Sequence, residues 1–159
     1  MNETDDPTPL TIPGHWSFDY NYFAGSAATR FFHELKVNRR IMGTLCPQCE
    51  RVLVPARSFC DACFVETTEW REVGNRGTVE AFTIITGAIP GLPDPPIVVG
   101  YVLLEGASSA VLNLIRGVDL TDLDAAGQLL VSGPNVTVEF SDDPQGRITD
   151  FAFTCEVPA

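Results

Sequence analysis

The 159-residue chain has few basic residues, and lysine is nearly missing from it. Ten lysines and arginines stand against 21 acids, so the formal net charge at pH 7 is −11, and Lys36 is the single lysine. Nucleic-acid binding depends largely on Lys and Arg contacts to phosphates, so this charge argues against a nucleic-acid partner. A continuous apolar run is also missing, and a membrane span needs about 18 or more such residues. We therefore expect neither nucleic acid nor membrane as a partner.

Residues that carry out catalysis are equally scarce. His15 and His33 are the two histidines, and neither has an evident catalytic partner nearby in the sequence. Gly-rich phosphate loops, nucleophile elbows and metalloprotease helices are missing too. Cys155 is the one candidate thiol nucleophile outside the paired cysteines, but it alternates with Phe151, Phe153 and Val157, which predicts a core-facing position. We expect no catalytic residues, and hence a chain that is not an enzyme on its own.

The sequence does contain four cysteines in two C-x-x-C pairs. Cys46 and Cys49 form the first pair, and Cys60 and Cys63 follow after a gap of ten residues. Four thiolates bind Zn²⁺ tetrahedrally at about 2.3 Å and leave no position for water, so we expect one structural zinc ion. Iron in a redox site uses the same ligands and remains the alternative.

The acidic N-terminus lacks the apolar segment of a secretory signal, so we expect a cytoplasmic protein. In that reducing compartment, paired cysteines favour a metal over disulfides.

Aromatic side chains alternate with polar ones shortly before the first predicted helix. Trp16, Phe18, Tyr20 and Tyr22 share one face of an extended segment because side chains in a strand repeat every two residues. They pack either on this chain's own sheet or on another subunit, and the sequence leaves both open.

The remaining pattern predicts a helix followed by short strands. Ser26 is the expected N-cap of a helix reaching about Val37, with Ala28, Phe31, Phe32 and Leu35 on one apolar face. After the cysteines, strands are predicted at residues 77–86, 97–105, 108–116, 128–132, 135–140 and 147–157. The fold class is therefore mainly β, ending in a small OB-fold barrel. The expected order is an extended arm (1–25), a helix (26–42), a zinc ribbon (43–70) and the barrel (71–159).

This order resembles a known family, the rubredoxin-like zinc ribbons joined to acyl-CoA-associated OB folds (domain-of-unknown-function family thirty-five). The residues that carry the resemblance are Phe31-Phe32-His33-Glu34-Leu35, Gly43-Thr44-Leu45-Cys46-Pro47-Gln48-Cys49, Val54-Pro55-Ala56-Arg57-Ser58-Phe59-Cys60-Asp61-Ala62-Cys63, Gly77-Thr78-Val79 and Ile97-Val98-Val99. The family often has Gly after the second cysteine, where Glu50 stands here, so that turn must accommodate a Cβ atom.

The resemblance implies an auxiliary subunit rather than an enzyme. Members associate with thiolase-superfamily proteins, either thiolases or thiolase-like aldolases, which supply the reactive groups for acyl-CoA substrates. A hetero-oligomer is then expected, with a coenzyme A thioester at or near the interface. Arg39, Arg40 and Arg57 are candidates for contacting CoA phosphates or acids of the partner, although they could instead pair with this chain's own acids. A stand-alone nucleic-acid-binding module is the alternative function, which the negative charge disfavours.

Overall fold

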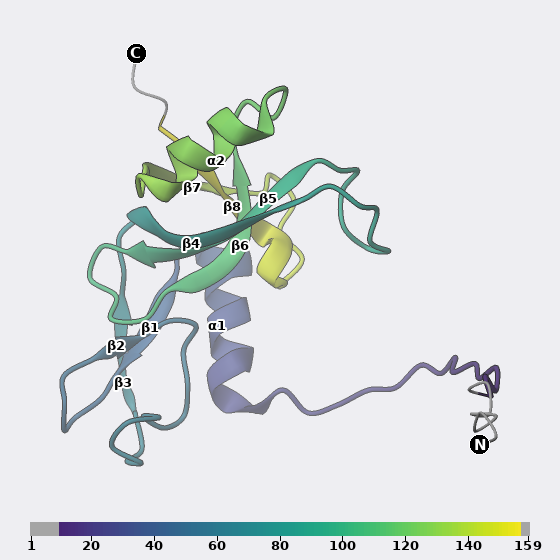
Figure 1. Ribbon diagram of the computed structural model, residues 1–159. Helices are drawn as coiled ribbons and strands as arrows, with labels where there is room; N and C mark the ends of the chain where they lie inside the picture. The colour runs from purple at the N-terminus through teal and green to yellow at the C-terminus, as the bar shows by residue number, and fades with distance from the viewer. Residues whose placement is uncertain (1–9, 157–159) are drawn as a thin grey trace, which may run out of the picture.

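The computed structural model describes residues 10–156, which form an N-terminal arm, a small sheet and a barrel (Figure 1). The helices are α1 (Gly25–Asn38) and α2 (Leu123–Val131), with a 3₁₀ turn at Ile148–Asp150. The strands are β1 (Met42–Leu45), β2 (Val52–Leu53), β3 (Glu69–Glu72), β4 (Arg76–Ile85), β5 (Ile97–Leu104), β6 (Val111–Arg116), β7 (Asn135–Phe140) and β8 (Phe151–Cys155). The predicted mainly β fold is confirmed.

Helix α1 uses its apolar face as predicted but begins differently. Phe31 and Leu35 are buried one turn apart, which docks the helix on the core. The N-cap position is Ala24, with no side-chain cap, so the expectation that Ser26 caps the helix is wrong. Gly25 turns the chain into the helix with a φ of 83°, a value that glycine tolerates, and Ser26 falls inside the first turn.

The small sheet has the order β2-β1-β3, with β1 antiparallel to both neighbours. The sequence did not predict β3, because its mostly charged residues give little strand signal. Thr44 of β1 is fully buried, and its hydroxyl donates to the carbonyl of Arg57 at 2.8 Å and accepts from the N–H of Arg57 at 3.0 Å. This exchange holds the segment before the second cysteine pair against the sheet.

The barrel closes in the order β4-β5-β6-β8-β7, and β7 pairs back with β4. Strands β6 and β8 run parallel, while the other neighbours run antiparallel. Inward residues alternate along each strand, as in Val98, Val102 and Leu104 of β5. Cys155 is 5% exposed in the same core, as the alternation predicted.

One predicted strand is wrong. Residues 128–131 belong to α2 and Ser132 is its C-cap; the helix covers one end of the barrel near β4 (Figure 1). The carboxylate of Asp122 accepts the N–H groups of Asp124 and Ala125 at 3.0 Å each, and this cap starts a helix that buries Ala126 and Leu130. Among the described residues, neither helix has the length and apolar character to cross a membrane.

Candidate metal centre

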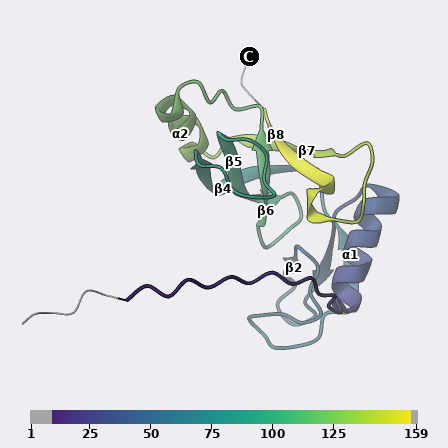
Figure 2. The ribbon, with the colours of Figure 1, turned by 90° about the vertical axis from the view of Figure 1, so that its right-hand side faces the viewer.

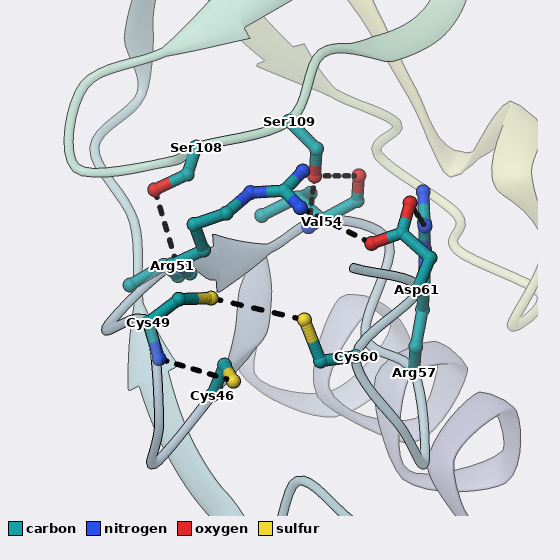
Figure 3. A network of polar contacts seen from close by, with 10 residues as sticks. Cys46, Cys49, Arg51, Val54, Arg57, Cys60, Asp61, Ser108 and Ser109 are labelled. Carbon is teal, nitrogen blue, oxygen red and sulfur yellow. Dashed lines mark hydrogen bonds and ion pairs between the residues drawn. The ribbon is translucent and has the colours of Figure 1, made fainter. Parts of the chain in front are cut away.

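The structure brings the four paired cysteines into one cluster at the end of the small sheet. Figure 3 shows three of them, Cys46, Cys49 and Cys60. Their Sγ atoms all lie within 4.8 Å of one another, and those of Cys49 and Cys60 are 3.8 Å apart. A tetrahedron with metal–sulfur bonds of about 2.3 Å has edges of about 3.8 Å. All five cysteines of the chain are free thiols. The cluster therefore has the geometry of a site for one metal ion.

Both cysteine pairs use the same backbone turn. The N–H of Cys46 donates to the carbonyl of Arg51 at 2.9 Å, and the N–H of Glu50 donates to the carbonyl of Cys46 at 3.0 Å. The N–H groups of Cys60 and Phe64 form the equivalent bonds in the second pair, at 2.9 Å each. This repeated turn presents the two thiols of each pair to one ion.

The residue after each pair has a left-handed backbone. Glu50 and Phe64 both have a φ of 56°, in a region where side chains with a Cβ atom are strained. The sequence pointed to this strain at Glu50, because relatives often have Gly there. It did not point to Phe64.

The pKa values of the thiols differ because burial and hydrogen bonds within the cluster act on each thiol differently. Burial raises the pKa of Cys46, but the N–H groups of Cys49 and Gln48 outweigh it and lower the pKa to about 7. The hydrogen bond to Cys49, together with burial, raises the pKa of Cys63 to about 12. Four thiolates at these distances need a cation to compensate their charge, so the donor set fits a divalent metal.

Two arginines and one acid border the metal site. Arg51 and Arg57 each place a guanidinium nitrogen 3.2 Å from a carboxylate oxygen of Asp61, which follows Cys60 (Figure 3). Burial alone would raise the pKa of Asp61, but a backbone hydrogen bond and the two arginines lower it. The structure thus places Arg57 in an ion pair within this chain.

The other two candidate arginines lie elsewhere. Arg40 contacts the buried carboxylate of Glu34 at 2.7 Å and the exposed carboxylate of Glu72 at 3.2 Å. The hydrogen bond from Arg40 lowers the pKa of Glu34. Arg39 donates to the backbone carbonyl of Asp142 at 2.9 Å. The three arginines therefore occupy three separate sets of contacts, and two of them pair with this chain's own acids.

The aromatic side chains of the arm lie in solvent. Trp16, Phe18, Tyr20 and Tyr22 are between 62% and 86% exposed, and the centroids of successive rings are 5.6 to 6.2 Å apart. The arm leaves the start of α1 and extends away from the small sheet and the barrel (Figures 1 and 2).

Sequence reasoning missed further exposed aromatic residues, three of them near the arm and the metal site. Phe23 at the base of the arm is 92% exposed, and Phe59 and Phe64 beside the second cysteine pair are 52% and 82% exposed. Their signal was a large apolar side chain outside the named helices and strands, where no core position receives it.

Two family models match adjacent parts of the chain. The rubredoxin-like zinc ribbon domain of ChsH2 matches residues 34–69, and the C-terminal OB-fold domain of ChsH2 matches residues 70–148. No curated protein matches the chain significantly.

Solved structures share the fold. A DUF35-family protein of unknown function from Sulfolobus solfataricus has a TM-score of 0.60 and 22% identity, over 83% of this chain and 87% of that chain. An Ltp2-ChsH2(DUF35) aldolase has a TM-score of 0.59 and 16% identity, over 86% of this chain and 100% of that chain. The four-cysteine site is accordingly that of a zinc ribbon, and the predicted zinc cofactor is confirmed. With this ribbon followed by the matching OB fold, the chain belongs to the ChsH2 family of DUF35 proteins.

Proposed function

We propose that this chain is the non-catalytic, zinc-containing subunit of a thiolase-superfamily complex that acts on acyl-CoA thioesters. The family resemblance supports a thiolase-fold partner. A second support is the name of a structure with the same fold, which joins ChsH2 to Ltp2 in an aldolase.

The exposed aromatic arm is the observation that carries the proposal. Four large rings between 62% and 86% exposed on one segment are unfavourable in water, so the chain is completed by another polypeptide. The residues described, 10–156, also lack a plausible reaction centre: the four thiolates close the metal site, Cys155 is buried, and His15 and His33 are exposed. The partner then supplies the reactive groups, and this chain stabilises the partner and the passage for CoA.

The partner's reaction is thiolytic cleavage or condensation in the first candidate function. Retro-aldol cleavage of an acyl-CoA is the second candidate, and the aldolase with the same fold favours it. Assays with the same complex separate the two, because thiolysis needs free CoA as a co-substrate and retro-aldol cleavage does not.

Contact with CoA phosphates is proposed for the three candidate arginines, and Arg39 is the best placed of them. Its guanidinium contacts a backbone carbonyl, whereas Arg40 and Arg57 are already paired with carboxylates. Reversing the charge of Arg39 should raise the KM for acyl-CoA or weaken the complex. If assembly and kinetics are unchanged, Arg39 has no such contact.

The deciding experiment is co-expression with thiolase-superfamily proteins encoded beside this chain, followed by purification and assay of the complex. We expect a stable hetero-oligomer whose acyl-CoA turnover requires the partner. Turnover of a thioester by this chain alone at an enzymatic rate would contradict the proposal, and so would failure to co-purify with any thiolase-superfamily protein.

A further inference from the structure

We infer that residues 16–22 bind the partner subunit by adding a β-strand to the free edge of one of its sheets, with the four aromatic side chains filling apolar pockets beside that edge. This inference rests on the proposed function and specifies how the two subunits recognise each other.

The arm already has the shape and the polarity of an edge strand. Rings two residues apart lie side by side, with centroids 5.6 to 6.2 Å apart, which places them on one face of an extended backbone. Ser17, Asp19 and Asn21 occupy the alternate positions. Within the described part of the chain, residues 16–22 form no hydrogen bond with the small sheet or the barrel, so their backbone N–H and C=O groups are free to pair.

The area involved suits a protein interface. If a fully exposed aromatic side chain has about 200 Å² to bury, the four rings supply roughly 600 Å². One side of a standard interface buries about 800 Å². The arm alone therefore provides most of the surface that one subunit needs.

The sheets of the described residues offer the arm of a second copy only short edges that carry charge. The barrel closes where β4 pairs with β7 over Arg76, Gly77 and Thr78, and closure removes the edge there. Residues 80–85 of β4 pair with β5 alone, and they include the charged Glu80. The outer edge of β2 is occupied by the turn between β5 and β6: the N–H groups of Val52 and Val54 donate to the hydroxyls of Ser108 and Ser109 at 3.1 and 2.7 Å (Figure 3).

The edge of β3 is also a poor match. It is four residues long against the seven of the arm, and three of its residues are charged: Glu69, Arg71 and Glu72. Charged side chains on an edge strand oppose pairing with another strand. We therefore assign the receiving edge to the partner subunit, where apolar surface flanks it. A homodimer of this chain that the ring exchange at positions 20 and 21 abolishes would overturn that assignment.

The test uses the full chain and the thiolase-superfamily subunit with which it is co-expressed. In one variant, Tyr20→Asn is combined with Asn21→Tyr, which keeps length, composition and charge but moves one ring to the polar face. In the matched control, Asn21→Ser alone changes the polar face. Because the arm lies off the rest of the chain, both variants should keep the zinc content and the Tm of the wild-type chain.

We expect the exchange variant to bind the partner about 30-fold more weakly, as for loss of an interface hot spot, and the control to bind like wild type. In the wild-type complex, the amides of residues 16–22 should be protected from hydrogen exchange at every second position, because one edge of an added strand remains free.

The outcomes separate the two proposals. Equal affinities of the exchange variant and wild type, or uniformly unprotected arm amides in a complex that still forms, overturn strand addition and leave the proposed function standing. Failure of the wild-type chain to bind any thiolase-superfamily protein overturns both.

Discussion

Single residues in this protein show where the metal site strains the backbone. Glu50 and Phe64 follow the two cysteine pairs with a φ of 56°, and neither is buried: Phe64 is 82% exposed. The backbone turn around the metal imposes this conformation, since the N–H of each residue closes the turn onto the first cysteine of its pair. Packing within this chain gives no compensation for the strain.

Glycine at position 50 should therefore stabilise the ribbon. The left-handed conformation costs an ordinary residue about 1–2 kcal/mol, and glycine adopts it freely but loses more entropy on folding. We expect Glu50→Gly to raise the free energy of unfolding by about 0.5–1 kcal/mol, measured by urea denaturation with zinc present. Gln48→Gly is the control in the same turn and should give no gain. Equal or lower stability of Glu50→Gly would show that the turn is not strained there.

Asp150 is a buried carboxylate that holds the loop before β8, and no sequence pattern pointed to it. Its two oxygens accept the N–H groups of Gln145, Gly146 and Arg147 at 2.9, 2.6 and 3.0 Å, and the residue is 3% exposed. Burial alone would raise the pKa of Asp150, but the three N–H donors lower it below the usual range. Such a carboxylate stabilises the fold in its ionised form.

The expected effect of Asp150 depends on pH. The folded pKa lies below the unfolded value of about 3.9, so its stabilisation is complete well above that pH and is lost as the pH falls through the folded pKa. Asp150→Asn turns one acceptor into a donor and should lower the free energy of unfolding by about 2 kcal/mol at pH 7. Denaturation curves of both proteins should converge as the pH falls below about 4. Acid release of zinc should affect the wild type and Asp150→Asn alike. If the difference between their free energies of unfolding does not change with pH, Asp150 does not stabilise the fold through its charge.

At the scale of elements, hydrophobic periodicity predicted most of the chain. The apolar face of α1, the presence of strands at β7 and β8 and the buried place of Cys155 all follow from spacing in the sequence. The prediction failed for residues 128–132, where a short apolar run reads equally well as a strand or a helix. The side chain of Asp122 caps the N-terminus of α2 and so favours a helix over a strand. This cap lies six residues before the apolar run, outside the window that predicted the strand.

The zinc ribbon should depend on its metal more than the barrel does. Cys46, Leu53 and Cys60 form a small core separate from the main one, and the main core holds the inward residues of the barrel. We expect Cys60→Ser to lose zinc and unfold the ribbon, because metal binding there is also folding energy, while β4–β8 stay protected from hydrogen exchange.

Cys155→Ser is the matched control, since it changes a buried cysteine that does not belong to the four-thiol cluster. It should keep one zinc per chain, measured by elemental analysis. A Cys60→Ser protein with full metal content and an unchanged melting curve would contradict a structural role for the site.

For the whole molecule, the negative net charge argues against the nucleic-acid binding that zinc ribbons and OB folds often carry out. A net charge of −11 repels phosphate backbones, so we expect no binding of single-stranded DNA at about 0.15 M salt, measured by fluorescence anisotropy. Binding that weakens as salt is added would revive the nucleic-acid alternative.

The sequence by itself determined the metal ligands, the mainly β class and the order of ribbon and barrel. These features depend on local spacing: two residues between paired cysteines, and apolar side chains repeating every two or every three to four residues. Only the tertiary structure decided that Arg40 and Arg57 pair with Glu34 and Asp61, and that the aromatic arm leaves its rings exposed. Those outcomes depend on which distant segments meet when the chain folds, and local spacing carries no information about that.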